Sequence, residues 1–312
     1  MKNLLRALIL IVTICGIGTI GFVAVAQRYP GIIWLMDDLA YVSPYCPGWR
    51  VVLDSNVQVE QLYETDRISN ESSVIATTDA RDLWDTPQGR FWIPSGNPDI
   101  LPILLAQQER EIYGDAEWGV QPGDVVLDCG AHVGVYARTA LSKGASLVVA
   151  IEPSPRALEC LRRNLSDEIE SGRVIVYPKG VWDSETELTF FQNADGAAGD
   201  SFVQRAEDAN VVEKIAVNTI SRIAEELRLE RVDLIKMDVK GATQRAIHGA
   251  AAVIRAHQPR LVLSTEEAGD EPLSITSLVQ SINPQYHLKT GPCIAHDSSV
   301  FTDVLFLRSD NW

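Results

Sequence analysis

Two carboxylates and two glycines stand where they could bind the nucleoside part of a cofactor. Asp128 directly follows an apolar run, and Gly130 and Gly134 come after it with the spacing G-x-x-x-G. Gly130 permits a tight turn and a close approach of the backbone to a ligand, and Gly134 allows the following helix to pack closely. Glu152 ends the next apolar run, where a carboxylate can accept hydrogen bonds from both hydroxyls of a ribose. The pattern therefore indicates a nucleoside-containing cofactor.

The charge beside the glycines distinguishes between two classes of cofactor. A dinucleotide fingerprint has the spacing G-x-G-x-x-G and places a pyrophosphate at a helix N-terminus. Asp128 would repel a pyrophosphate but attract an ammonium or sulfonium group. S-adenosylmethionine carries both of these cations and a ribose but no phosphate, so the electrostatics favour this methyl donor. A strand-to-helix turn of the same shape that binds no ligand is the alternative interpretation.

Four further residues are candidates for the proton transfer that methylation of an oxygen requires. Asp238 ends another apolar run, Glu266 follows the next one together with Glu267, and His132 lies within the glycine turn. As structural alternatives, Glu266 and Glu267 suit a solvated loop, and His132 suits a role in shaping the cofactor loop. The acids could also bind Mg²⁺, which prefers oxygen ligands. The histidines show no metal-ligand spacing, and no metal site is predicted.

Alternating strands and helices are expected to bring these residues together. Apolar runs predict buried strands, and apolar residues at i, i+3, i+4 and i+7 predict the helices between them. Buried strands that alternate with helices indicate an α/β fold with a parallel, doubly wound sheet. Right-handed crossovers then place the carboxyl ends of the strands, and hence the ligand, at one edge. The predicted strands are 125–128, 147–151, 174–177, 232–239, 261–263 and 303–307, and the predicted helices are 133–141, 155–165, 242–257 and 275–282.

The region from 31 to 115 combines short apolar runs with turn-forming residues. Its runs 51–53 and 57–59 are predicted as strands, and 100–113 is predicted as an amphipathic helix. Trp34, Trp84 and Trp92 are predicted core aromatics, with sugar stacking as the alternative. We expect this region to cover the catalytic core and to shape the acceptor pocket.

Four blocks of sequence resemble the FkbM family of S-adenosylmethionine-dependent methyltransferases, and the resemblance covers residues 85–308. The blocks are GRFWIP from Gly89, VVLDCGAHVGVYA from Val125, VVAIEPSP from Val148 and VDLIKMDVKGA from Val232. The resemblance implies the class I methyltransferase fold, a Rossmann-like and mostly parallel sheet whose last strand is antiparallel. It also implies methyl transfer, commonly to a hydroxyl oxygen of a sugar, lipid or secondary metabolite.

The resemblance also implies roles for individual residues. Asp128 and Gly130 would contact the methionine part of the cofactor, Glu152 the ribose, and residues 180–183 would lie near the adenine. One position departs from the family pattern, because Lys240 stands where the family usually has glutamate.

This change from acid to base could remove a substrate contact, supply a new anion contact, or mark a protein that binds cofactor without turnover. A solvated lysine at a helix start is the alternative for Lys240. A methyltransferase-like binding or scaffold protein without turnover is therefore the second functional hypothesis. A nucleotide-dependent oxidoreductase is the third, and the glycine spacing disfavours it.

An uncharged stretch of 20 residues, 7–26, lies near the N-terminus. As a helix it would rise about 30 Å, which is enough to cross the hydrocarbon core of a bilayer. A signal peptide cleaved after Ala26 is the alternative, but its apolar region is usually roughly 7–15 residues long, so an uncleaved transmembrane helix is favoured. The predicted organisation is an anchor or signal segment at 1–30, a covering extension at 31–115, and an S-adenosylmethionine-binding domain at 116–312.

The charge of the chain limits its partners and its location. The net charge of −15 excludes nucleic acid as the main partner, which leaves a small-molecule, glycan or lipid acceptor and, through the anchor, the membrane. More positive residues precede the uncharged stretch, Lys2 and Arg6, than follow it, Arg28. This excess predicts that the N-terminus lies in the cytoplasm and the domain across the membrane. S-adenosylmethionine is made in the cytosol, however, so a single-pass protein with its domain on the cytoplasmic face is favoured. No oligomeric state is predicted.

The cysteines exclude two classes of small scaffold. The chain has five cysteines without C-x-x-C spacing, which excludes a zinc ribbon and a disulfide-dense fold. Cys46, Cys160 and Cys293 allow at most one bridge and leave the redox compartment undecided.

Overall fold

The computed structural model describes residues 30–31, 41–192, 202, 210–265, 272–296 and 299–310. The chain divides into two compact units, a small unit of residues 1–60 and 292–302 and a large unit of residues 61–291 and 303–312. The predicted anchor at 7–26, Trp34, Glu266 and Glu267 lie outside the described residues. Within the described ranges, we find no helix with the length and hydropathy needed to span a membrane.

The small unit joins two distant parts of the chain. A disulfide links Cys46 to Cys293, with Cα atoms 5.8 Å apart, and both cysteines are buried. The side-chain amide of Gln58 donates to the Ala295 carbonyl at 2.8 Å and accepts from the Ala295 N–H at 3.0 Å. These contacts accompany a three-stranded sheet in which β15 pairs in parallel with β1 and antiparallel with β14. The strands are β1 (Tyr41–Val42), β14 (Cys293–His296) and β15 (Ser299–Thr302).

Helix α3 (Gly48–Glu71) occupies the region where strands were predicted at 51–53 and 57–59. That prediction was wrong because a β-branched residue costs less than about 1 kcal/mol in a helix, and no proline or glycine interrupts residues 49–71. Val51 and Ser55, one turn apart, are fully buried. Arg50 Nε donates to Asp54 at 3.0 Å along the same helix. Burial of one face and pairing along the helix therefore outweigh the weak strand preference.

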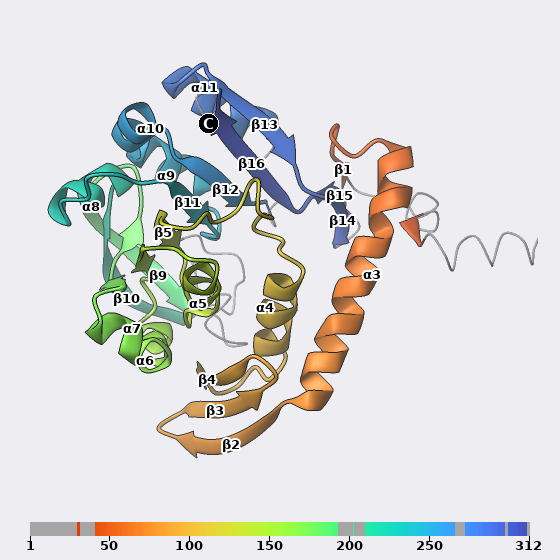
Figure 1. Ribbon diagram of the computed structural model, residues 1–312, viewed down its shortest axis with the longest axis vertical. Coiled ribbons are helices and arrows are strands. Elements are labelled where there is room, and N and C mark those ends of the chain that lie inside the picture. The colour runs from red at the N-terminus through yellow and green to blue at the C-terminus, as the bar shows by residue number, and fades with distance from the viewer. Residues whose placement is uncertain are drawn as a thin grey trace, which may run out of the picture. The chain divides into compact units, whose positions relative to one another are not determined.

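A seven-stranded sheet forms the centre of the large unit, in the order β13-β16-β12-β11-β5-β6-β7. Figure 1 labels its strands β13, β16, β12, β11 and β5. Strands β12, β11, β5, β6 and β7 pair in parallel, whereas β16, the last strand, is antiparallel to both of its neighbours. The expected mostly parallel sheet with an antiparallel last strand is confirmed. The strands are β5 (Val125–Cys129), β6 (Leu147–Ile151), β7 (Val174–Tyr177), β11 (Leu234–Met237), β12 (Arg260–Ser264), β13 (Tyr286–Thr290) and β16 (Val304–Ser309).

Alternate residues of the central strands pack against different helices. In β5, Leu127 and Cys129 belong to a buried cluster with residues of α8 to α11, and Val126 belongs to a second cluster with residues of α5 and α6. A strand buried on both faces needs a continuous apolar run, which explains the runs in the sequence. The predicted helix 242–257 is divided at Ala250 into α9 and α10. The helices are α5 (Val135–Ser142), α6 (Pro155–Asn164), α7 (Ser166–Glu170), α8 (Ile220–Glu226), α9 (Thr243–Gly249), α10 (Ala251–His257) and α11 (Pro272–Ile282).

Part of the predicted covering region shares a hydrophobic core with the glycine turn. Trp84, Phe91 and Leu105 lie in one buried cluster with Val133, which follows His132 in the turn. The strands β2 to β4 form an antiparallel sheet, and β10 pairs with both β8 and β9 in another. These elements are β2 (Ser73–Thr78), β3 (Arg81–Thr86), β4 (Gly89–Pro94), α4 (Ile100–Glu109), β8 (Gly180–Val181), β9 (Thr186–Gln192) and β10 (Asn210–Asn218).

Candidate active site

The turn after β5 requires glycine at position 130. Gly130 has a φ of +78°, in the left-handed region that residues with a Cβ rarely adopt. A Cβ at this position would also overlap the carbonyl oxygen of Asp238, which follows β11. Gly134 has a φ of +88°, and a Cβ there would lie 2.8 Å from Cδ1 of Leu165. The first glycine lets the turn approach the end of β11, and the second lets the start of α5 pack against the end of α6.

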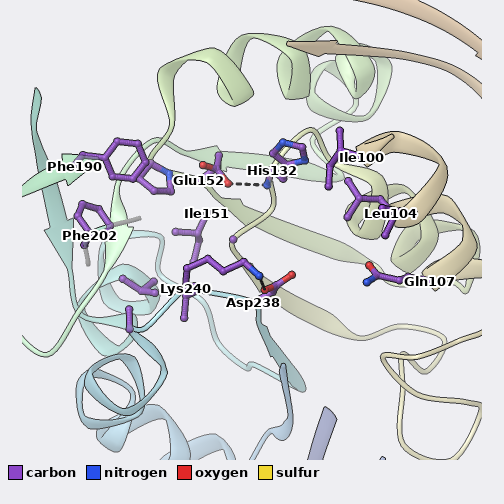
Figure 2. Close-up of a pocket in the computed structure, with 16 residues that line it drawn as sticks. Ile100, Leu104, Gln107, His132, Ile151, Glu152, Phe190, Phe202, Asp238 and Lys240 are labelled. Carbon is purple, nitrogen blue, oxygen red and sulfur yellow. Dashed lines mark hydrogen bonds and ion pairs between the residues drawn. The ribbon is translucent and has the colours of Figure 1, made fainter. Parts of the chain in front are cut away.

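Glu152 lies at the end of β6 and holds the glycine turn in place. Its Oε2 accepts a hydrogen bond from the backbone N–H of His132 at 2.7 Å (Figure 2), and its Oε1 accepts one from the N–H of Ser154 at 2.8 Å. The residue is buried. These two bonds show that Glu152 supports the glycine turn from the end of β6.

His132 is buried in an uncharged form. Its φ of +49° is uncommon for a residue other than glycine. Burial lowers the pKa of His132 to about 4, although the charge of Asp238 opposes this effect. The Nδ1 atom is buried and has no hydrogen-bond partner among the described residues. At neutral pH the ring is therefore uncharged.

Asp238 lies directly after β11, close to Lys240. The Nζ atom of Lys240 is 3.9 Å from Asp238 Oδ1 (Figure 2), and the Tyr113 hydroxyl donates to Oδ2 at 3.1 Å. Burial tends to raise the pKa of Asp238, but Lys240, Lys236 and the bond from Tyr113 hold it below its ordinary value. Asp238 is therefore ionised at neutral pH. A carboxylate of this kind is a strong partner for a cation and a weak proton acceptor.

A cavity lies at the carboxyl ends of β5, β6 and β11. Figure 2 shows Phe190 and Phe202 on one side of it and Ile100 and Leu104 of α4 on the opposite side. The ring centroids of Phe190 and Phe202 are 5.0 Å apart. The cavity thus combines apolar walls with polar groups at the strand ends, as ligand sites in open α/β sheets do.

Most of the residues singled out from the sequence line this one cavity. The lining includes Gly130, His132, Glu152, Asp238 and Lys240. Asp128 and Gly134 are not part of the lining, because Asp128 is fully buried beneath the turn and Gly134 packs against Leu165. Glu266, the remaining catalytic candidate, is outside the described residues.

Asp128 forms a buried ion pair with Lys236. The Nζ atom of Lys236 lies 3.1 Å from Asp128 Oδ1 and donates to the Gly130 carbonyl at 3.0 Å. The two side chains are 4% and 0% exposed. Burial alone would lower the pKa of Lys236, but attraction by Asp128 and Asp238 outweighs this effect and raises it. Lys236 therefore stays charged beneath the glycine turn.

The sequence pattern does not identify Lys236 as a site residue. A signal was present, because Lys236 is a single lysine within the apolar run 232–239. Lys236 and Asp128 occupy paired positions of the adjacent parallel strands β11 and β5, so their side chains lie on the same face. The pair forms because β11 and β5 are neighbours in the sheet, and the spacing of residues along the chain does not show this.

The region expected near the adenine also reaches the cavity. Val181 of β8 is part of the lining. A Cβ on Gly180 would lie 2.5 Å from the Phe202 ring, so the small residue lets this ring pack against β8. Asp183 Oδ2 accepts a hydrogen bond from Arg245 at 2.6 Å. The β8 side of the cavity is therefore lined by the apolar side chains of Val181, Phe190 and Phe202.

Comparison with known proteins gives one family match. Residues 128–281 match the methyltransferase FkbM domain. No curated protein matches the chain.

The similar solved structures have low sequence identity. Methyltransferase FkbM from Methylobacillus flagellatus KT is 17% identical with a TM-score of 0.44, and the match covers 83% of this chain and 61% of that one. The chain therefore spans less than two thirds of that protein. TYW2 from M. jannaschii in complex with AdoMet is 13% identical with a TM-score of 0.42, over 76% of this chain and 90% of that one. Trm5 from Methanocaldococcus jannaschii in complex with adenosine is 13% identical with a TM-score of 0.43, and the match covers 75% of this chain and 57% of that one.

Proposed function

Because the chain contains a methyltransferase FkbM domain, whose cofactor is S-adenosylmethionine, we propose that it methylates a hydroxyl oxygen of a sugar, lipid or secondary metabolite. The family and the cofactor are those predicted from the four sequence blocks. The observation that carries the proposal is the cavity at the carboxyl ends of β5, β6 and β11, which Gly130, Glu152 and Asp238 line together.

The residues of the cavity fit this cofactor. The backbone at Gly130 leaves no room for a side chain and so permits close approach by a ligand. Glu152 can accept hydrogen bonds from ribose hydroxyls, and Phe190 and Phe202 offer an apolar wall to the purine. Asp238 is ionised and can attract a cationic group. The cofactor supplies a methyl group that its sulfonium already activates.

The chain's own contribution is alignment, exclusion of water and removal of a proton. Alignment of the reacting atoms supplies much of the rate in a displacement of this kind. The apolar residues Ile100, Ile103 and Leu104 of α4 keep water from one side of the cavity. His132 lines the cavity, and its uncharged ring is a candidate to accept the proton of an acceptor hydroxyl, although its lowered pKa makes it a weak base. Asp238, whose pKa is also lowered, is likewise a weak proton acceptor.

Methyl transfer tests the proposal directly. The full chain is incubated with S-adenosylmethionine labelled in the methyl group and with a membrane or cell-wall extract, and the extract is assayed for label. We expect transfer by the wild type and at least about tenfold less by Glu152→Gln, which loses charge-assisted hydrogen bonds. Glu225→Gln, at an exposed position on α8, is the matched control and should behave as the wild type. Failure of the wild type to bind S-adenosylmethionine in isothermal titration would contradict the proposal.

A methyltransferase-like binding protein without turnover is the second candidate. Lys240, which replaces the family's usual glutamate, lines the cavity 3.9 Å from Asp238 and supports this alternative. It predicts tight binding of the cofactor but no transfer of label to any extract. Transfer by Lys240→Glu and not by the wild type would favour it, whereas transfer by the wild type would exclude it.

We also propose that residues 7–26 anchor the protein in a membrane as a single pass. Two observations support opposite locations for the rest of the chain. The cytosolic supply of S-adenosylmethionine supports the cytoplasmic face. The Cys46–Cys293 disulfide supports the other face, because disulfides persist mainly in oxidising compartments. Protease treatment of sealed membrane vesicles decides between them: digestion from the cytoplasmic side supports the first location, and protection supports the second.

A further inference from the structure

The buried lysine determines which acid is accessible to the cationic tail of the cofactor. We propose that Asp238, and not Asp128, binds the ammonium group in the methionine part of S-adenosylmethionine. The inference rests on the proposed function, and it adds a subsite that differs from the one implied by the sequence resemblance.

Asp128 is already engaged by a cation of the protein itself. Lys236 lies 3.1 Å from Asp128 Oδ1 and donates to the Gly130 carbonyl at 3.0 Å. A carboxylate and a carbonyl oxygen are the groups that an ammonium ligand would use, and Lys236 uses both. Because Asp128 is 0% exposed, a second cation could reach it only by displacing Lys236.

Lys236 is held in this position from several sides. Its Nζ lies 5.2 Å from the centroid of the Tyr113 ring and 5.5 Å from that of the Tyr136 ring. Its strand position is paired with that of Asp128 in the sheet. The aromatic faces and the carboxylate both favour a cation at this place. Displacement of Lys236 would leave a charged group buried without these partners, which is strongly unfavourable.

Asp238, in contrast, is accessible from the cavity. Its side chain is 22% exposed and lies among the lining residues. Tyr113 donates to Oδ2, and Lys240 approaches Oδ1 only to 3.9 Å, which is longer than a hydrogen bond. The lowered pKa keeps the carboxylate charged at neutral pH. A ligand ammonium can therefore bond to Oδ1 in competition with Lys240 and without disturbing the bond from Tyr113.

Glu152, the other acid that lines the cavity, lies at the end of a different strand from Asp238. Glu152 supports the glycine turn through the N–H groups of His132 and Ser154 and lies at the end of β6, where a ribose is expected. Assignment of Asp238 to the ammonium also removes it from the candidate bases. The remaining candidates for accepting the proton of the acceptor are then His132 and Glu266, and Glu266 lies outside the described residues.

A pair of ligands separates this subsite from the rest of the cofactor site. S-adenosylhomocysteine and 5′-methylthioadenosine share the adenosine and the thioether sulfur, but only the first carries the ammonium and carboxylate tail. Their Kd values are measured by isothermal titration for the full chain. We expect the wild type to bind S-adenosylhomocysteine at least about tenfold more tightly, as a charge-assisted hydrogen bond implies. In Asp238→Asn this preference should fall by about tenfold, while the Kd of 5′-methylthioadenosine changes by less than about twofold.

The matched variant tests the competing assignment. Lys236→Met combined with Asp128→Asn removes both charges of the buried pair and also the bond from Lys236 to the Gly130 carbonyl. We therefore expect the Kd values of both ligands to rise together, while the preference for S-adenosylhomocysteine is kept. Asp238→Glu, which retains the charge, should keep part of it, and thermal unfolding confirms that each variant is folded. A preference that persists in Asp238→Asn, or that disappears in the double variant, would overturn the assignment. If the wild type binds neither ligand, the proposed function itself is wrong.

Discussion

The ammonium group of Lys236 lies 3.1 Å from the carboxylate of Asp128 inside the large unit, on adjacent parallel strands. The pair explains how an acid can be fully buried directly beneath a turn that lines the cavity at the carboxyl ends of the strands. A buried carboxylate without a partner would be costly, whereas a paired and hydrogen-bonded one is tolerated. The same lysine bonds to the Gly130 carbonyl. The ion pair thus links the stability of the sheet to the shape of the turn.

Removal of one partner of this pair should be more harmful than removal of both. Lys236→Met leaves the Asp128 carboxylate buried without its cation, so we expect the free energy of unfolding to fall by about 3–5 kcal/mol. The combination with Asp128→Asn should recover most of this loss, because no unpaired charge then remains. Denaturant unfolding of the three proteins measures both effects. Equal losses in the single and double variants would contradict a stabilising pair.

The glycine turn should tolerate no side chain at position 130. Gly130→Ala combines a left-handed backbone with overlap of the Asp238 carbonyl, so we expect a loss of stability above about 2 kcal/mol and much weaker binding of S-adenosylmethionine. Gly172→Ala is the matched control, because Gly172 also has a positive φ, +75°, but a Cβ there meets nothing within 4 Å. It should lose only about 1 kcal/mol and keep cofactor affinity. Similar effects of the two changes would show that close approach to Asp238 does not matter.

Burial of uncharged His132 should make the protein sensitive to acid. The pKa of His132 is lowered to about 4 in the folded state, so between this value and the ordinary pKa of about 6.5 the unfolded state binds more protons. The stabilising contribution of the uncharged ring is complete above the ordinary pKa and is lost as the pH falls towards the folded pKa. It amounts to at most about 3 kcal/mol.

Substitution of the ring tests this linkage. His132→Gln should lose less stability than the wild type between neutral and acidic pH, as measured by denaturant unfolding at several pH values. His248→Gln, at an exposed position on α9, is the control and should follow the wild type. If His132→Gln and the wild type show the same dependence on pH, the ring is not buried in its uncharged form.

The disulfide should stabilise the small unit alone. Cys46→Ala combined with Cys293→Ala removes a bridge between residues 247 positions apart, and we expect a loss of about 2–5 kcal/mol. Binding of S-adenosylmethionine should persist, because the described residues that line the cavity belong to the large unit. Cys160→Ala serves as a control at a free, buried cysteine. Alkylation of intact cells before and after reduction, read by mass spectrometry, would show whether the bridge forms in vivo; a fully reduced pair would remove the support for an oxidising compartment.

The order of the elements around the cavity follows from the residue pattern alone. Apolar runs that alternate with helical patterns predict a parallel sheet, and in such a sheet the carboxyl ends of the strands share one edge. This rule predicts that Gly130, Glu152 and Asp238 lie at one edge of the sheet. In the structure they line one cavity. It is reliable because strand direction and crossover handedness follow from local backbone sterics.

Which groups are paired and which remain accessible depends on contacts in the folded protein. The apolar runs at 51–53 and 57–59 became part of helix α3, because packing outweighs a weak strand preference. Three cysteines are candidates for one bridge, and the structure joins Cys46 to Cys293, which lie in one buried cluster of the small unit. Lys236 reaches Asp128 because their strands are neighbours in space and not in sequence. Charge compensation and burial depend on contacts between distant segments, and the spacing of residue types along one chain does not contain them.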